Sequence, residues 1–198
     1  MRVLIINTGT AENQILRESL EWLRDLFEEK GAEAQLFDVQ SESLRGCVAC
    51  GKCYRSGRCI FDDEVNKVIA EMENYDGLII GGEVLYGDLN DKSVHFLERL
   101  FHAGTGVLAR KPGSAVLYSR RRLDESAAGL LAPYFAQANM PVVAVQSGHV
   151  IYGDSGRQKV LSSIVSQMIW LMNCLEAGKN DDVDFADGAP ERVLNFIR

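Results

Sequence analysis

Four of the five cysteines lie within thirteen residues, and their chemistry is the most distinctive in this sequence. Cys47, Cys50, Cys53 and Cys59 follow the spacing C-x2-C-x2-C-x5-C. Thiolates this close in sequence can bind one soft metal ion or one iron–sulfur cluster, and scattered core cysteines rarely show such spacing. The segment therefore predicts a metal centre, and the rest of the chain must indicate which process that centre serves.

Three interpretations of the cysteine segment are open. A four-iron–four-sulfur (4Fe-4S) cluster is favoured because three of the cysteines form one run. The spacing differs from that of bacterial ferredoxins, since five residues rather than three precede Cys59 and Ile60 rather than proline follows it. The second interpretation is structural zinc, which usually takes two separated C-x2-C pairs, and the third is an empty, reduced loop. The fifth cysteine, Cys174, is interpreted as inert packing in the last helix.

The composition excludes several classes of protein. The chain has 198 residues, 46% of them hydrophobic and 25% charged, which suits one globular domain with a sizeable core. Its net charge of −7 argues against a nucleic-acid binder, which usually has a basic face. No uninterrupted apolar run approaches the ~18 residues of a membrane span, and the apolar start is too short for a signal peptide. We therefore expect a cytoplasmic protein whose reduced cysteines serve metal or redox chemistry.

Apolar strands and amphipathic helices alternate five times along the chain. The strands are short apolar runs, as in a parallel sheet that is buried on both faces. They are predicted at residues 2–6, 34–39, 76–82, 114–118 and 141–145. Helices are predicted between them, including one at about 124–139 and a last one after residue 160. The pattern predicts an α/β, flavodoxin-like three-layer sandwich with a five-stranded parallel sheet of order 2-1-3-4-5.

Three loops follow the strand ends where ligands bind in such sheets. The first leads into a helix N-terminus, where backbone N–H groups bind anions such as phosphate. The second has glycines on both sides of a tyrosine, so that a flat ligand could approach the backbone and lie against the ring. The third carries arginines, which suit a phosphate or an anionic ring. The candidate ligand-binding residues are Thr8, Gly9, Thr10 and Asn13; Gly82, Glu83, Val84, Leu85, Tyr86 and Gly87; and Ser119, Arg120 and Arg121.

With these loops, residues 2 to about 153 resemble the flavodoxin-like family of NAD(P)H-dependent FMN reductases. The family's FMN phosphate loop would correspond to residues 8–13, and its Gly-Ser-Pro-Val-Tyr loop to residues 82–86. Its stretch ending in Asp/Glu-Arg is similar to Phe96-Leu97-Glu98-Arg99, and its Met-Pro-Val-Val strand is similar to residues 140–143. The cysteine segment resembles that of the family's iron–sulfur flavoprotein branch, which tolerates the longer gap before the fourth cysteine. Because it lies between the second strand and the following helix, we expect it on the ligand-binding side of the sheet.

The resemblance implies FMN as cofactor, a 4Fe-4S cluster at the four cysteines and NAD(P)H as a possible reductant. It implies an FMN-binding domain at residues 1–178, with a cysteine-rich insertion at 46–61 and a C-terminal tail at 179–198. The sequence departs from the family in three places. After the fifth strand, Ser147-Gly148-His149 stands where the family commonly has Tyr-Trp-Asn. The first loop lacks the usual Ser-Pro-Arg, and Glu83 and Val84 replace the usual Ser and Pro of the second loop, which brings a negative charge near the flavin.

We therefore expect an FMN-dependent oxidoreductase that transfers electrons between a flavin, a cluster and a small acceptor. A ferredoxin-like donor is the other expected partner, and neither nucleic acid nor a membrane is expected. No side chain stands out as an acid or base. His149 is the candidate for a substrate contact, whereas His95 and His102 are interpreted as structural.

Two other functions remain open at this point. One is a non-catalytic electron carrier, and the other is a flavin-free zinc-binding module. In the latter, the three loops would be helix caps, a glycine-rich turn and a solvated charge run. The last helix also has a second apolar stripe, Val165, Ile169 and Met172, with Trp170 beside it, which predicts a homodimer or homotetramer.

Overall fold

The computed structural model describes residues 1–41, 43–120, 129–144, 150–151 and 156–180. Its elements alternate along the chain as the sequence predicts. They are β1 (Arg2–Asn7), α1 (Gln14–Glu29), β2 (Glu33–Asp38), α2 (Cys53–Ser56), α3 (Glu64–Glu71), a 3-10 turn (Met72–Asn74), β3 (Gly77–Leu85), β4 (Asp88–Leu89), α4 (Asp91–Ala103), α5 (Thr105–Leu108), β5 (Gly113–Ser119), α6 (Ala132–Gln137), β6 (Val150–Ile151) and α7 (Arg157–Asn180).

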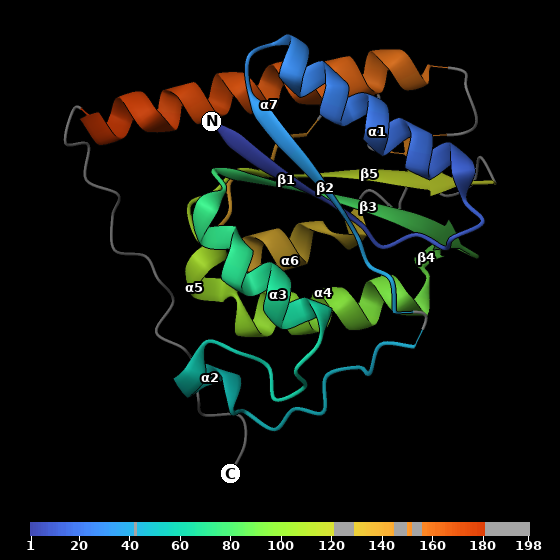
Figure 1. Ribbon diagram of the computed structural model, residues 1–198, viewed down its shortest axis with the longest axis vertical. Coiled ribbons are helices and arrows are strands. Elements are labelled where there is room, and N and C mark those ends of the chain that lie inside the picture. Colours follow the sequence, from blue (N-terminus) through green and yellow to red (C-terminus); the bar gives the residue numbers. More distant parts are fainter. Residues whose placement is uncertain (42, 121–128, 145–149, 152–155, 181–198) are drawn as a thin grey trace.

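The sheet lies between two layers of helices, and each layer closes its own core. α1 and α7 cover one face, and α3, α4 and α6 cover the other (Figure 1). Successive side chains of β1 point to opposite faces, so Val3 and Ile5 pack towards α1 and α7 whereas Leu4 and Ile6 pack towards the other layer. Burial on both faces explains why the strand is apolar without alternation.

The sheet has the predicted order, with one addition. Its strands are arranged β2-β1-β3-β5-β6, and all of these neighbours pair in parallel. This confirms the flavodoxin-like topology, with β5 and β6 as its fourth and fifth strands. The addition is β4, a two-residue strand that pairs antiparallel with the end of β3. It pairs with the part of β3 that continues beyond the end of β1, whose last pair with β3 is Asn7 with Gly81.

The predicted fifth strand and the helix before it are both shorter than expected. Among the described residues 141–144, Val142 forms a single parallel bridge to Gly113, and the paired strand is β6, next to Leu117 and Tyr118. The helix predicted at 124–139 is α6, which has Pro133 in its first turn, where proline is best tolerated. It ends before Asn139, whose φ of 53° is not helical. Residues 121–128 lie outside the described part of the chain.

The second apolar stripe of the last helix faces the core of the same chain. Val165 and Met172 are buried with the sheet and α1, so the stripe gives no support to an oligomer, although Trp170 is 67% exposed. Cys174 is also exposed, which corrects its assignment to the core. By length and composition alone α7 could cross a membrane, contrary to the sequence expectation. Core helices meet the same criterion, and α7 packs against α1 and β5.

Candidate functional site

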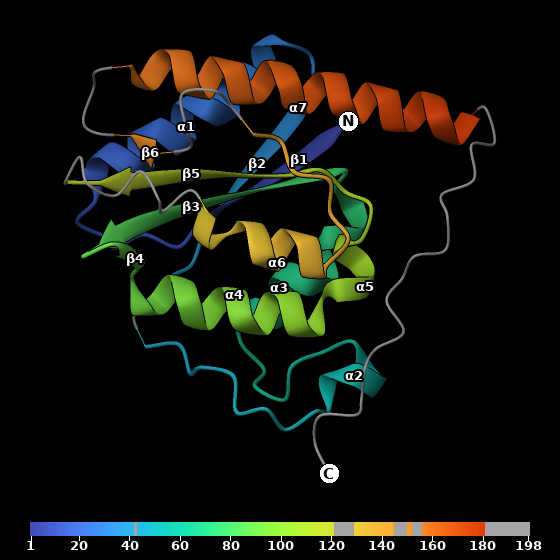
Figure 2. The same cartoon turned by 180° about the vertical axis from the view of Figure 1, so that it is seen from behind.

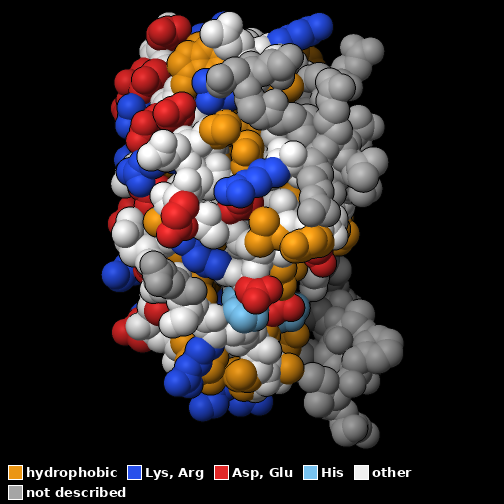
Figure 3. Space-filling model, turned by 90° about the vertical axis from the view of Figure 1, so that its right-hand side faces the viewer, with side chains coloured by type: hydrophobic (Ala, Val, Ile, Leu, Met, Phe, Trp, Pro, Cys, Tyr) orange, Lys and Arg blue, Asp and Glu red, His pale blue; other side chains and the backbone are white. Residues whose placement is uncertain are grey.

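A large cleft lies at the carboxyl ends of the strands, where the topology predicts a ligand. Its volume is about 1000 Å³, and its walls are the β1–α1 loop, the end of β2, the β3–β4 hairpin and the start of α4. A second hollow of about 320 Å³ adjoins it and is lined by Thr10, residues 83–86, Ser119 and Arg120. All three predicted loops therefore meet at this edge, which Figure 3 views directly, and side chains of both charges gather on it.

The first part of the β1–α1 loop is used internally. Thr8 is fully buried, and its hydroxyl donates to the Gly81 carbonyl at 2.8 Å and lies 2.6 Å from the Ser93 hydroxyl. The N–H of Gly9 donates to Asn7 Oδ1 at 3.0 Å. These bonds fix the loop between β3 and α4, so Thr8 and Gly9 shape the site rather than supply free donors to it.

The second part of this loop presents unpaired donors. Within the described residues, the N–H groups of Thr10, Ala11 and Glu12 donate to no protein atom. Asn13 begins α1, because its side-chain oxygen accepts from the N–H of Leu16 at 3.1 Å. Its Nδ2 is buried and has no hydrogen-bond partner, which is costly unless a ligand satisfies it. Together with the positive end of the helix, these groups suit a phosphate.

Glu83 places a carboxylate in the wall of the second hollow. It is only 3% exposed, and the hydroxyl of Thr10 donates to its Oε2 at 2.8 Å. The exposed Arg120 lines the same hollow and carries the opposite charge. The hollow can therefore hold a ring whose charge changes during reaction, with a carboxylate on one side and a guanidinium on the other. Arg121 and His149 lie outside the described residues.

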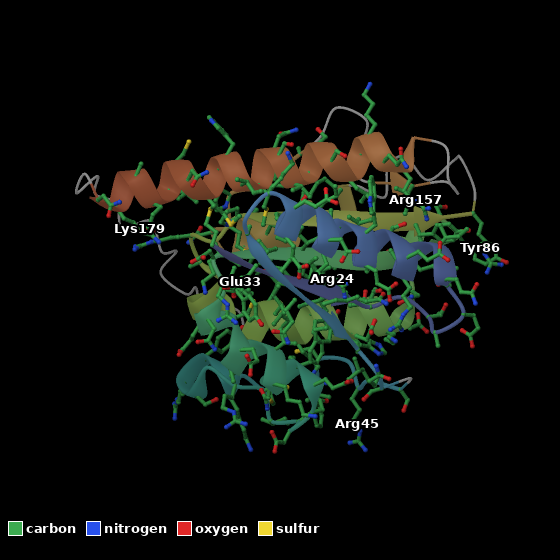
Figure 4. The ribbon with its side chains drawn as sticks, turned by 45° about the horizontal axis from the view of Figure 1, so that its top comes forward. Arg24, Glu33, Arg45, Tyr86, Arg157 and Lys179 are labelled. Atoms are coloured by element: carbon green, nitrogen blue, oxygen red, sulfur yellow. The ribbon has the colours of Figure 1, made fainter. Side chains whose placement is uncertain are left out.

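The β3–β4 hairpin differs from the predicted loop. Residues 82–85 continue strand β3, and the turn consists of Tyr86 and Gly87, both with positive φ. Tyr86 is 88% exposed and stands at the far end of the sheet (Figure 4). Gly81 serves packing rather than ligand approach, because a Cβ there would lie 2.4 Å from Leu20 of α1. Gly82 is similarly enclosed by core side chains.

The cysteine segment leaves the end of β2, runs beneath α4 and returns to α3 (Figures 1 and 2). Its four cysteines line one cavity of about 130 Å³, together with Arg99 and other residues of α4. Burial raises the pKa of the Cys53 thiol, and the neighbouring Cys47, Cys50 and Cys59 raise it further. In the described part of the chain, no three His, Cys, Asp or Glu side chains are gathered as ligands of a single metal ion.

Polar residues on one face of α4 contact this segment. His95, Glu98, Arg99 and His102 are spaced three and four residues apart, so they share one helix face. His95 Nδ1 lies 2.8 Å from the Leu44 carbonyl, and Glu98 accepts from the N–H of Cys47 at 3.4 Å. The structural interpretation of His95 fits this contact, whereas His102 lines the cysteine cavity. The predictions omitted Glu98 and Arg99 from the site, although polar residues at helical spacing were a signal that could have found them.

The cysteine cavity and the strand-end cleft have no lining residue in common. We expected the cysteine segment on the ligand-binding side of the sheet, and only its first residues, at the end of β2, lie there. α4 connects the two regions, because Lys92 and His95 line the cleft while Arg99 and His102 line the cysteine cavity. The two sites are thus neighbours along one helix rather than parts of one pocket.

Glu64 anchors the start of the cysteine segment, and we expect Glu64→Gln to destabilise the protein in a pH-dependent way. Its carboxylate accepts from the N–H groups of Gln40 and Ser41 at 2.9 and 3.0 Å. Burial opposes ionisation, but these bonds outweigh it and lower the pKa of Glu64 below 4.5. At neutral pH the variant should lose about 1–3 kcal/mol of unfolding free energy.

The sign of the pH dependence follows from the lowered pKa. The contribution of Glu64 is fully present above the ordinary pKa of about 4.5 and is lost as the pH falls through the lower folded value. Urea unfolding from pH 7 to pH 3 should therefore show the difference between wild type and Glu64→Gln shrinking in acid. Glu71→Gln, on the exposed side of the same helix, is the matched control. A constant difference across this range would contradict the assignment.

The fold and the cleft define a flavodoxin-like α/β protein with an anion-binding loop after its first strand. Solved structures of flavoproteins share this fold. RosB with a bound 8-demethyl-8-formylriboflavin-5'-phosphate intermediate aligns over 100% of this chain and 93% of its own, with a TM-score of 0.66 and 14% identity. A flavodoxin from the domain Archaea aligns over 89% of this chain and 99% of its own, with a TM-score of 0.57 and 14% identity.

Residues 1–153 match the model of the NADPH-dependent FMN reductase family, and the chain belongs to this family. It is therefore a flavin-dependent oxidoreductase. An iron-sulfur flavoprotein of Methanocaldococcus jannaschii is 26% identical over 83% of this chain and 85% of its own length. An iron-sulfur flavoprotein of Archaeoglobus fulgidus is 25% identical over 81% and 85%, respectively. The family resemblance inferred from the loops and from the cysteine spacing is thus confirmed.

Proposed function

We propose that this protein transfers electrons between NAD(P)H, an FMN bound in the strand-end cleft and an acceptor, with a 4Fe-4S cluster at its four cysteines. The observation that carries the flavin part is the set of unpaired donors on the β1–α1 loop, above all the buried Nδ2 of Asn13. A buried amide without a partner costs about 1–3 kcal/mol, and a phosphate oxygen would satisfy it.

The residues of the cleft suit the parts of FMN. The N–H groups of Thr10, Ala11 and Glu12 and the Asn13 amide would hold the phosphate. The second hollow would take the ring, next to Leu85, Tyr86, Gly87 and Ser119. The buried carboxylate of Glu83 disfavours added negative charge on the ring, and the candidates Arg120 and Arg121 would balance the charge of this carboxylate. When bound, the flavin supplies hydride and single-electron chemistry, while the protein binds and orients it and excludes water.

The cysteine cavity suits a cluster better than a single zinc ion. A tetrahedral zinc with Zn–S bonds of ~2.3 Å would draw the sulfurs to roughly 4 Å from one another. In the described residues the thiols line one cavity without forming such a group. A cluster binds each thiolate to a different iron and so spreads the sulfurs further apart. The two archaeal relatives named iron-sulfur flavoproteins support the same choice.

The proposal extends to assembly and partners. Electrons would pass between the cluster and the flavin, whose cavities are neighbours along α4, and the assembly would be a homodimer or homotetramer. The acceptor would be a small molecule, and a ferredoxin-like protein could replace NAD(P)H as donor. We propose a cytoplasmic location, where the thiols stay reduced.

The decisive experiment is anaerobic purification followed by visible spectroscopy and analysis of flavin, iron and acid-labile sulfide. We expect one FMN per chain, a broad cluster absorbance that dithionite bleaches, and flavin reduction by NADH or NADPH. FMN should bind at least ~100-fold more tightly than riboflavin, which lacks the phosphate. Reduction only through a protein donor would indicate a non-catalytic carrier. A colourless protein with one zinc per chain would contradict the proposal.

A further inference from the structure

The buried side chain of Arg99 packs against the cysteine segment. It comes from α4, is 1% exposed and uses all five of its N–H donors. Nη1 and Nη2 donate to the two carboxylate oxygens of Asp63, at 2.7 and 2.8 Å. Nη1 also donates to the Arg45 carbonyl at 3.2 Å, and Nη2 to the Phe61 carbonyl at 3.3 Å. The fifth donor, Nε, points to Cys59 Sγ at 3.2 Å.

These bonds close the cysteine segment at both ends. Arg45 precedes Cys47 by two residues, and Phe61 follows Cys59 by two residues. One guanidinium therefore holds the two ends of the loop, and it also lies over the Phe61 ring, 5.1 Å from its centre. Asp63 caps the start of α3, where its side chain accepts from the N–H of Val65, and it neutralises the buried charge of Arg99. Lysine has three donors on a single nitrogen and could not reproduce this fork.

The contact with sulfur distinguishes one cysteine from the others. Within the described residues, Cys59 is the one of the four whose Sγ accepts a hydrogen bond from another side chain. The guanidinium is always charged, and it is paired with the carboxylate of Asp63 at 2.7 Å. A charged N–H donor next to a ligating sulfur stabilises the state with more negative charge, which in an iron–sulfur centre is the reduced state.

We propose that Arg99 is the positioning residue of the cysteine centre. It closes the loop so that the four thiols face one cavity, and its Nε–H···Sγ bond to Cys59 raises the reduction potential of the group held there. This inference rests on the proposed cluster, and it extends that proposal to a residue outside the ligand set. It also predicts an asymmetric centre, in which the iron bound by Cys59 is the one most favoured for reduction.

The test compares Arg99→Lys with wild type and with Arg58→Lys, which changes an exposed arginine of the same loop. Each protein is loaded anaerobically with iron and sulfide, and its midpoint potential is measured by a redox titration followed by electron paramagnetic resonance. We expect Arg99→Lys to shift the potential to more negative values, while Arg58→Lys matches wild type. Equal potentials in all three loaded proteins would overturn the role of Arg99.

A second measurement needs no variant and covers the case in which Arg99→Lys does not fold or load. Wild-type protein with 15N-labelled arginine is reduced, and electron–nuclear double resonance is recorded in H2O and D2O. We expect a 15N coupling and an exchangeable proton coupling from the guanidinium, and their absence would overturn the inference. Failure of the proposed cluster is recognised separately, because wild-type protein would then take up no iron and sulfide, and the role of Arg99 would fall with it.

Discussion

Replacing Cys50 by serine is expected to lower the iron and inorganic-sulfide content of the protein to roughly a tenth of the wild-type value or less. Cys50 is exposed, so the change removes a thiolate without opening a gap in the core. Its sulfur is one of the four that line the cysteine cavity. A serine hydroxyl is a poor ligand for iron, and three thiolates are too few for a cluster that uses four.

Cys174→Ser is the matched control, because Cys174 is the other exposed cysteine and lies on α7, away from the cavity. It should keep the full iron and sulfide content. FMN binding should be unchanged in both variants, since the cleft and the cysteine cavity have no lining residue in common. Full iron and sulfide content in Cys50→Ser would show that Cys50 is not a ligand of the cluster. One zinc per wild-type chain would show that the four cysteines form a structural zinc site instead of a cluster.

The parts of the fold that the sequence predicted well are those with a strong local pattern. β1 and β5 are apolar because both faces of the sheet are covered, and α1 and α7 have apolar residues at helical spacing. Alternation of such elements leaves few topologies, so the strand order followed from it. The fifth strand was misplaced because residues 141–145 have strand-like composition, whereas among the described residues 141–144 only Val142 bridges β5.

The roles of single residues depended on contacts that the sequence does not contain. Thr8 and Asn13 are both polar residues of one loop, yet Thr8 bonds to β3 and α4 whereas the amide of Asn13 has no protein partner. Gly82 was predicted to let a ligand approach the backbone, but side chains of β4 and β5, Leu89 and Leu117, lie beside it. In each case the packing of another element decides which of two chemically reasonable roles a residue has.

The position of the cysteine segment was also beyond the reach of local patterns. Its spacing predicted a metal centre, and its place after β2 suggested the strand-end cleft. The path of the segment is instead set by long-range contacts. Glu64 binds the backbone just after β2, and Arg99 binds the carbonyls at both ends of the cysteine loop. Arg99 lies 40 residues from Cys59, so this contact becomes apparent only once α4 is packed against the loop.

Asn13→Asp is expected to weaken FMN binding at least ~100-fold, about 3 kcal/mol, with little change in stability. Aspartate has the same shape and keeps the oxygen that accepts from the N–H of Leu16, so α1 keeps its cap. A carboxylate at the start of a helix is also favoured by the helix dipole. What changes is the second atom of the side chain: a buried donor becomes an acceptor with negative charge, facing the phosphate.

Fluorescence titration with FMN and with riboflavin tests this directly. Riboflavin has no phosphate, so Asn13→Asp should bind it as wild type does, and this separates a local effect from damage to the cleft. Gln14→Glu is the charge-matched control, because it adds the same charge at the next, exposed position of α1, where solvent and salt screen it. FMN affinity equal to wild type in Asn13→Asp, or equal losses for FMN and riboflavin, would mean that the phosphate is not held by the start of α1.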